Sequence, residues 1–302
     1  MPASRVVLIT GAARGIGAEL ARVLARRGDR LALVGLEPER LAALAQELGP
    51  PHAWFECDVT DQAMLDRAVE GTLSALGGID VVVANAGIAS LGTVAVTPAD
   101  ALARVIAVNL TGVVRTVSAT LPHVCARKGY YLLVSSVAAM VANPGLAVYA
   151  ASKSGVEQFG NALRLELAAE GVDVGTAHPC WIETDLVHDA RRDLASFDAM
   201  LRRLPGPFHK VTSVQECARA LAEAVERRKR RVYVPKSLAL VSLLRPLFTT
   251  RLAGWLLRRE VGGLLPDLER EVAELGRCFG ENSVETQGKP PSAHTASGPR
   301  PR

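Results

Sequence analysis

Short apolar runs alternate with segments of helical periodicity from residue 5 to about residue 235 of the chain. The runs consist of nearly continuous valine, leucine and other small apolar residues, which is typical of strands covered on both faces in a parallel sheet. Glycines such as Gly28 and Gly49 stand where the intervening helices are expected to end. The alternation indicates the α/β class, with a doubly wound parallel sheet of about seven strands flanked by helices. We expect the strands at 5–10, 30–35, 53–59, 81–85, 130–136, 172–179 and 231–235.

Two regions interrupt this alternation. Residues 185–212 form a polar and basic segment whose length is unusual for a loop and typical of a lid. Beyond residue 235 the chain is strongly apolar, then becomes charged with helical spacing, and from about 281 is rich in serine, threonine, proline and glycine. We therefore expect one domain at 1–236, a helical C-terminal extension at 237–280 and a disordered tail at 281–302.

Composition narrows the classes of function. The net charge of +4 is modest for 302 residues, and no stripe of basic and aromatic residues accompanies it, so nucleic acid is not an expected partner. We see no signal peptide and no run of 18 uncharged apolar residues, so a simple transmembrane helix is not expected. The five cysteines lack metal-ligand spacing and indicate reduced thiols, a cytoplasmic setting and no metal site; they are Cys57, Cys125, Cys180, Cys217 and Cys278.

Unusual residues follow the expected strands, at the edge where an open parallel sheet binds its ligands. After the first strand, "TGAARGIG" (10–17) leaves bare N–H groups at a helix N-terminus, which favours a pyrophosphate. Asp58 follows the third strand and is suited either to accept a hydrogen bond from an adenine amino group or to cap a helix, as Thr60 could also do. The fourth, fifth and sixth strands are followed by "NAG" (85–87), by Ser135 and Ser136, and by "HPCWIETD" (178–185).

The stretch "VYAASK" (148–153) places a tyrosine four residues before a lysine. On a helix, Tyr149 and Lys153 would be neighbours. An ammonium beside a phenol favours the phenolate and lowers its pKa, so Tyr149 could act as a general acid or base near neutral pH. Taken alone, such a pair is more often an aromatic residue and a solvated lysine that share one helix face.

With "TGAARGIG", Asp58, "NAG", Asn109 in "VNLTG", and Ser136, this pair makes the chain resemble the short-chain dehydrogenase/reductase superfamily from about residue 5 to 235. The resemblance implies a Rossmann-type fold, a nicotinamide cofactor, and hydride transfer between an alcohol and a carbonyl. It makes Tyr149 the acid/base and Lys153 the residue that binds the nicotinamide ribose. It makes Ser136 the partner of the substrate oxygen, and Asn109 the holder of a water that links Lys153 to solvent.

The resemblance also implies a set of cofactor-binding residues. The family has a proline and a glycine after the sixth strand, where this chain has Pro179 and Cys180, and Thr184 stands about where a threonine meets the carboxamide. The replaced glycine puts the local backbone in question. The expected cofactor-binding residues are Gly11, Arg14, Gly15, Ile16, Gly17, Glu37, Asp58, Val59, Asn85, Ala86, Gly87, Tyr149, Lys153, Pro179, Ile182 and Thr184.

The sequence leaves the choice between NAD and NADP open. Relatives that prefer NAD often have an aspartate at the position of Gly35, and relatives that prefer NADP often have an arginine at the position of Leu36. Glu37 could accept a hydrogen bond from a ribose hydroxyl or repel a 2′-phosphate, whereas Arg14 could attract that phosphate. The expectation leans to NAD.

The substrate class follows from the apolar residues expected near the site, Met140, Leu146, Trp181 and Leu186, which indicate a hydrophobic alcohol or ketone. Trp181 is as readily a core residue as a pocket residue. A cofactor-binding regulator without turnover is the alternative, and the complete set of Asn109, Ser136, Tyr149 and Lys153 argues against it. We also expect a homo-oligomer.

The apolar stretch at 237–265 suggests contact with a membrane surface or a partner. Its arginines are costly at bilayer depth, and Pro246 and Gly254 would break one long helix, so the stretch is not expected to span a bilayer. Arginines and a tryptophan suit the membrane–water interface, where basic side chains meet anionic headgroups. The "RRKRR" run at 227–231 could add to that attraction. Folding over the active site or burial in a dimer is an equally serious interpretation.

Overall fold

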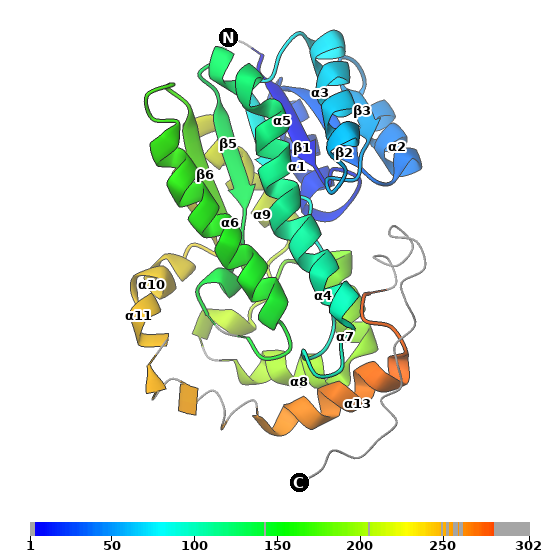
Figure 1. Ribbon diagram of the computed structural model, residues 1–302, viewed down its shortest axis with the longest axis vertical. Helices are drawn as coiled ribbons and strands as arrows, with labels where there is room; N and C mark the ends of the chain where they lie inside the picture. Colours follow the sequence, from blue (N-terminus) through cyan, green and yellow to red (C-terminus); the bar gives the residue numbers. More distant parts are fainter. Residues whose placement is uncertain are drawn as a thin grey trace.

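Figure 1 shows the computed structural model of the chain, which describes residues 4–280 except 142, 205, 249, 252–253, 256–258 and 260–261. The tail expected at 281–302 and part of the apolar stretch at 237–265 therefore lie outside the described residues.

The seven predicted strands form one parallel sheet in the order β3-β2-β1-β4-β5-β6-β7. The order reverses between β1 and β4, which is where a doubly wound sheet opens a crevice for a ligand. Four strands end earlier than predicted, β4 and β7 by one residue, and β3 and β5 by more, because Cys57–Val59 and Ser135–Ser136 already belong to the loops at that edge. The strands are β1 (Val6–Thr10), β2 (Arg30–Gly35), β3 (Ala53–Glu56), β4 (Val81–Ala84), β5 (Tyr130–Val134), β6 (Asp173–Pro179) and β7 (Arg231–Val234).

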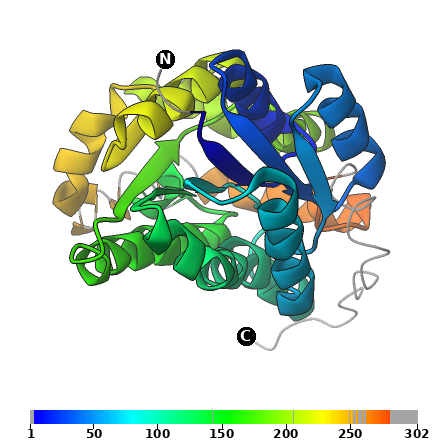
Figure 2. The ribbon, with the colours of Figure 1, turned by 90° about the horizontal axis from the view of Figure 1, so that it is seen from above.

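Helices cover both faces of the sheet (Figure 2). One apolar core joins the sheet to α1 (Gly15–Arg26), α2 (Pro38–Leu48) and α9 (Val214–Arg227). The core on the opposite face joins it to α3 (Gln62–Leu76), α4 (Ala99–Ile106), α5 (Gly112–Ala126) and α6 (Ala147–Glu166). Strands buried on both faces explain the continuous apolar runs in the sequence.

A π-helical turn at Ala107–Thr111 joins α4 to α5, so that Ala99–Ala126 is one continuous helical stretch. Within the described residues this is the one helix long and apolar enough to cross a membrane by length and composition. Its Val105, Val113 and Val117 are buried in the core against the sheet, as in the central helix of a soluble α/β domain.

A further layer lies beyond the carboxyl ends of the strands (Figure 1). The segment at 185–212, predicted to be a lid, forms α7 (Asp185–Asp193) and α8 (Ala195–Arg203), and α13 (Leu265–Leu275) lies across them. Leu194, Phe197 and Leu201 pack with Val272 in a small separate core. Thus α13 covers the same edge of the sheet as the segment predicted to be a lid.

The start of the C-terminal extension packs against the other end of this edge. There α10 (Leu238–Leu243) lies next to β7, and α11 (Arg245–Phe248) packs against α10. Arg245 donates hydrogen bonds to the Glu157 carboxylate on α6 at 2.9 Å and to the Ala139 carbonyl at 2.8 Å. Because the Glu157 side chain is only 6% exposed, Arg245 provides the countercharge for a buried carboxylate.

We predict that Arg245→Met destabilises the fold by about 1–3 kcal/mol, because it leaves the Glu157 carboxylate buried without its cation. Glu157→Gln in the same chain should restore most of the loss, since no charge is then left unpaired. Urea unfolding of the wild type, both single variants and the double variant measures the coupling. Additive losses in the double variant would contradict this account of the ion pair.

Candidate active site

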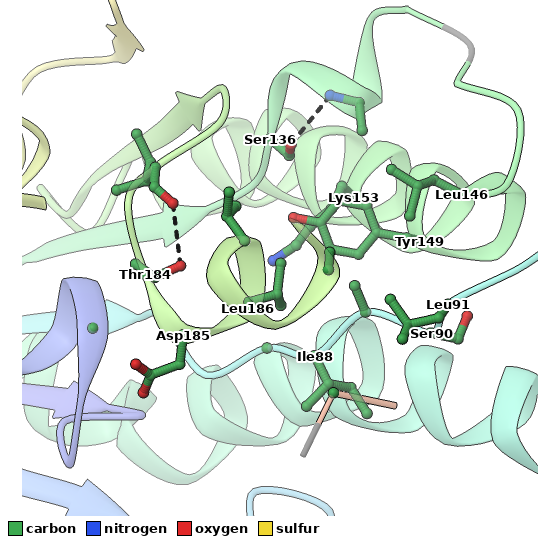
Figure 3. A pocket seen from close by; sticks show the side chains of 18 of the residues that line it. Ile88, Ser90, Leu91, Ser136, Leu146, Tyr149, Lys153, Thr184, Asp185 and Leu186 are labelled. Atoms are coloured by element: carbon green, nitrogen blue, oxygen red, sulfur yellow. Dashed lines mark hydrogen bonds between the residues drawn. The ribbon is translucent and has the colours of Figure 1, made fainter. Parts of the chain in front are cut away.

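A cavity of about 290 Å³ lies at the carboxyl edge of the sheet (Figure 3). Its walls come from the loops that follow β1 to β6, from α6, and from α7, α8 and α13. All but one of the residues predicted to bind a cofactor line this cavity, and Gly17 is the exception. Ser136, Tyr149 and Lys153, predicted to be catalytic, line it too.

The glycine loop after β1 is shaped by backbone contacts that no side chain would allow. Gly11 and Gly15 have φ of +65° and +55°, in the left-handed region that favours glycine. A Cβ on Gly17 would come within 2.2 Å of the Gly11 carbonyl oxygen. Gly17 therefore permits the tight turn, and its predicted contact with the cofactor stays a prediction.

The start of α1 has the features of an anion site. Arg14 is the N-cap residue, and its side chain makes no capping hydrogen bond. Gly15 and Ile16, the first helical residues, line the cavity, so the helix N-terminus with its positive dipole end faces the enclosed space. These residues fit the pyrophosphate of a dinucleotide without rearrangement.

Asn85 holds the glycine loop against the end of β4. Its side-chain amide donates to the carbonyls of Thr10 at 3.0 Å and Gly11 at 3.2 Å. The Thr10 hydroxyl accepts hydrogen bonds from the backbone N–H groups of Asn85 and Ala86, at 3.0 and 3.1 Å. The two strands at the switch point are thereby joined just below the cavity.

Arg14 and Glu37, which the sequence offers as opposing determinants of cofactor choice, form an ion pair with 2.9 Å between Nε and Oε1. Asp185, at the start of α7, lies 3.6 Å from the same guanidinium. The position predicted to hold the adenosine ribose therefore has one cation between two carboxylates. Asp185 ends the "HPCWIETD" motif, but its approach to Arg14 could not be predicted, because the two residues come from loops far apart in the sequence.

Asp58 lines the cavity and forms an ion pair with Arg104 of α4, with 2.7 Å between the charged atoms. Burial alone would raise the pKa of Asp58, but hydrogen bonds from Arg104 and from Thr60 outweigh it and hold the pKa below its usual value. The helix-cap alternative is wrong for both Asp58 and Thr60, because Asp61 caps α3 by accepting a hydrogen bond from the Met64 N–H.

The ambiguity between Ser135 and Ser136 is resolved by their partners. The Ser135 hydroxyl donates to the Lys153 carbonyl at 2.8 Å and so fastens β5 to α6. The Ser136 hydroxyl accepts from the Ala138 N–H at 3.2 Å and lies next to Tyr149 in the close view (Figure 3). Of the two hydroxyls, that of Ser136 is the one placed to meet a substrate oxygen beside Tyr149.

Tyr149 and Lys153 lie one helical turn apart on α6, as their spacing predicts. The Lys153 ammonium is 5.7 Å from the centre of the Tyr149 ring and donates to the Val134 carbonyl at 2.9 Å. Burial lowers the pKa of Lys153 from 10.5 to about 8. Burial raises the pKa of Tyr149, and the hydrogen bond with Ser136 opposes that rise only in part.

The expectation that Lys153 lowers the pKa of Tyr149 is therefore not met. Desolvation of the phenol is the largest effect on Tyr149, and the ammonium stands beside the ring without a direct bond to the hydroxyl. At neutral pH the phenol is protonated and Lys153 is largely charged. This is the state of an acid ready to give a proton to an oxygen in the cavity.

Asn109 lies in the π-helical turn, is fully buried, and does not line the cavity. Its side chain accepts from the Ile88 N–H at 2.8 Å and donates to the Ile88 carbonyl at 2.9 Å. It also donates to the Ser152 hydroxyl at 3.1 Å. Asn109 thus fixes the loop after β4 to α6, and the predicted water relay stays a prediction.

Two residues at the end of β6, His178 within the strand and Cys180 directly after it, have structural roles. The structure's only non-glycine residues with positive φ, within the described part of the chain, are Lys128 and Arg228, so Cys180 sits on ordinary backbone and the replaced glycine costs no strain. Burial raises the pKa of the Cys180 thiol to about 11, which leaves it protonated. His178 is fully buried and stacks on Tyr233, as expected of a satisfied strand residue.

The substrate side of the cavity is apolar. Leu146, Trp181 and Leu186 line it as predicted, whereas Met140 is buried behind the loop and does not. Trp181 is both a pocket residue and a packing residue, because its ring also packs edge-on against the Phe197 ring, with 5.2 Å between the ring centres. Sequence reasoning missed the residues that arrive from α8 and α13, namely Phe197, Met200, Leu264, Leu265 and Leu268.

Comparisons with known proteins agree with this geometry. The sequence model of a family described as short chain dehydrogenase matches residues 5–195. The 2-(R)-hydroxypropyl-CoM dehydrogenase of Xanthobacter autotrophicus is 32% identical over 67% of this chain and 84% of its own length. The mouse dehydrogenase/reductase SDR family member 7B is 30% identical over 84% of this chain and 82% of its own.

Other matches are narrower in what they show. The glycine betaine reductase ATRR of Emericella nidulans is 37% identical over 61% of this chain, but the match spans only 15% of that much longer protein. The crystal structure of a short-chain dehydrogenase/reductase from Burkholderia phymatum in complex with NAD has a TM-score of 0.71 at 23% identity. It covers 80% of this chain and 92% of its own, and at that identity it shows the fold.

The matched segment contains the glycine loop, the Ser136 loop and the Tyr149–Lys153 pair, whereas the cavity residues of α8 and α13 lie beyond it. The chain belongs to the short-chain dehydrogenase/reductase family, a family of NAD(P)-dependent oxidoreductases.

Proposed function

We propose that this protein interconverts a hydrophobic alcohol and the corresponding carbonyl compound, with Tyr149 as the acid/base. The observation on which the proposal rests is that Ser136, Tyr149 and Lys153 share one cavity with the glycine loop at the N-terminus of α1. A nicotinamide dinucleotide supplies or accepts the hydride when it is bound there. A regulator without turnover would not need a protonated phenol and a buried ammonium beside such a site.

The proposed roles follow from the partners of each group. In the direction of reduction, Tyr149 gives its proton to the substrate oxygen, and Ser136 donates a hydrogen bond to the same oxygen as negative charge develops on it. The Lys153 ammonium stabilises the phenolate that remains on Tyr149. In oxidation the same phenolate takes the proton back. The resemblance further supports a contact between Lys153 and the nicotinamide ribose.

The apolar wall supports the substrate class. Leu146, Trp181 and Leu186 face the cavity from the β5 and β6 side, and leucines of α13 close it from the end of the chain. Substrate carbon chains buried against such a wall gain free energy in proportion to the apolar area removed from water. Arg14 and Arg104 both line the cavity on the cofactor side, and each is already paired with a carboxylate.

For the cofactor we propose NAD in preference to NADP. The guanidinium of Arg14 is bound by Glu37 and flanked by Asp185, so two carboxylates surround one cation. A 2′-phosphate would have to displace Glu37 and accept its repulsion, whereas a 2′-hydroxyl could donate a hydrogen bond to it.

The role of Tyr149 is tested by Tyr149→Phe, which removes the proton donor and leaves the ring. We expect turnover of a good substrate to fall by about 10²–10⁴-fold, while the Kd for NADH stays within about twofold of the wild-type value. Tyr131→Phe is the matched control, because Tyr131 is a buried tyrosine outside the cavity. Near wild-type turnover in Tyr149→Phe would overturn the assignment.

Because Lys153 loses its charge as pH rises, the direction in which kcat/KM changes with pH can be predicted. Because the pKa of Lys153 is about 8, its side chain is mostly charged below pH 8 and mostly neutral above it. Since kcat/KM for the cofactor reports ionisations of the free enzyme, kcat/KM for NADH should fall as pH rises, with an apparent pKa of about 8. A profile that stays flat or rises up to about pH 10 would sink this prediction.

Cofactor choice is tested by Glu37→Gln. With one carboxylate removed, Arg14 is freer to meet a 2′-phosphate, so the Kd for NADPH should fall by about tenfold and the Kd for NADH should rise. Glu39→Gln, two residues further on and exposed outside the cavity, should change neither constant. Fluorescence titrations of both cofactors provide the measurement, and a wild-type protein that binds NADPH at least about tenfold more tightly than NADH contradicts the proposal.

A further inference from the structure

The α10–α11 segment presents a row of exposed apolar side chains. Leu240, Leu243 and Leu247 are 61%, 76% and 58% exposed, and Leu244 between them is 38% exposed. Leu240 and Leu243 are three residues apart on α10 and so share one side of that helix, and Leu247 follows on α11. Trp255 is 50% exposed further along the same segment. Soluble proteins seldom expose so many large apolar residues together unless something binds them.

The opposite side of the segment is fixed to the body of the protein. Leu238 and Val241 are buried against Val137, the residue after Ser136. The Tyr233 hydroxyl donates to the Ser242 hydroxyl at 2.8 Å, and Arg245 binds Glu157 and the Ala139 carbonyl. The inner side of the segment is thus occupied by contacts with the body of the protein. The exposed leucines lie on the outer side, where a binding partner could reach them.

The sequence from 232 to 259 carries charges of a single sign. Residues 232–259 contain five basic residues and no acidic residue. Lys236, Arg251 and Arg259 are exposed, and the Arg259 guanidinium stacks over the Trp255 ring at 5.8 Å. An arginine on a tryptophan suits the boundary between headgroups and acyl chains, where the ring is half in each medium.

The basic run at 227–231 does not belong to this surface. It lies at the amino end of β7, whereas α10 follows the carboxyl end. Arg227 and Lys229 pair with Glu223, and Arg228 pairs with Asp173, so three of its five residues have local partners. We therefore do not include the run at 227–231 in the proposed membrane-binding surface.

We propose that the α10–α11 surface docks the protein on an anionic lipid bilayer, with the exposed leucines and Trp255 inserted at the level of the headgroups. Apolar insertion and attraction of the basic residues to anionic lipid act together in such binding. A second copy of the chain fits less well, because a twofold contact through this surface would bring the same basic side chains of both copies together. The proposal does not depend on the reaction at the cavity.

The test is co-sedimentation of the full chain with vesicles of phosphatidylcholine alone and of phosphatidylcholine with about one third phosphatidylglycerol. We expect binding to the anionic vesicles, weakened by salt, and little to the neutral ones. The triple variant Leu240→Ser/Leu243→Ser/Leu247→Ser should bind at least about tenfold more weakly. Leu165→Ser is the matched control, since Leu165 is 78% exposed on the end of α6, outside this surface.

NADH titration of each variant shows separately that the fold and the cofactor site are intact, so loss of lipid binding is distinguished from unfolding. Lys236→Gln/Arg251→Gln provides a second variant that keeps the leucines and should bind anionic vesicles more weakly. The proposal is overturned if the wild type ignores anionic vesicles or if the triple variant binds them as well as Leu165→Ser does. A dimer that the triple variant converts to monomers, without vesicle binding by the wild type, would assign the surface to a second copy instead.

Discussion

The buried ammonium of Lys153 is the constraint around which the site is organised. A charge that is almost fully removed from water is costly, and here the Lys153 ammonium donates a hydrogen bond to the Val134 carbonyl at the end of β5. The lowered pKa of Lys153 expresses that cost. The protein retains the ammonium where it can act on Tyr149, and the remaining donors of Lys153 face the cavity in which we propose that a ribose binds.

Residues that never enter the cavity keep this arrangement in place. Ser135 ties β5 to the helix that contains Lys153, and Asn109 ties the loop after β4 to the same helix through Ser152. The π-helical turn is what brings the Asn109 amide to Ile88, and such turns occur often at functional sites. On the far side of Ser136, Val137 packs under α10, so the C-terminal extension supports the catalytic loop directly.

Local patterns in the sequence account for most of the fold and for the centre of the site. The strands are predictable because β5 and its neighbours are buried on both faces, and Tyr149 and Lys153 because helical spacing alone makes them neighbours. Contacts between distant segments could not be predicted in this way. Arg14 pairs with Glu37 and Asp185, and Asp58 with Arg104, through side chains that meet only when the loops are folded. Likewise, Gly17 and Met140 are close to the site in sequence, yet both lie behind the surface that faces the cavity.

The claim that the site transfers hydride is tested most directly by following the hydrogen itself. NADH that carries deuterium at the transferred position is incubated with the enzyme and a panel of hydrophobic ketones and aldehydes. The masses of the alcohols formed are measured by mass spectrometry. The account predicts that at least one member of the panel gives an alcohol about one mass unit heavier than the alcohol formed with unlabelled NADH. No labelled alcohol from any of them, in a protein that binds NADH tightly, would contradict the account and favour a cofactor-binding regulator.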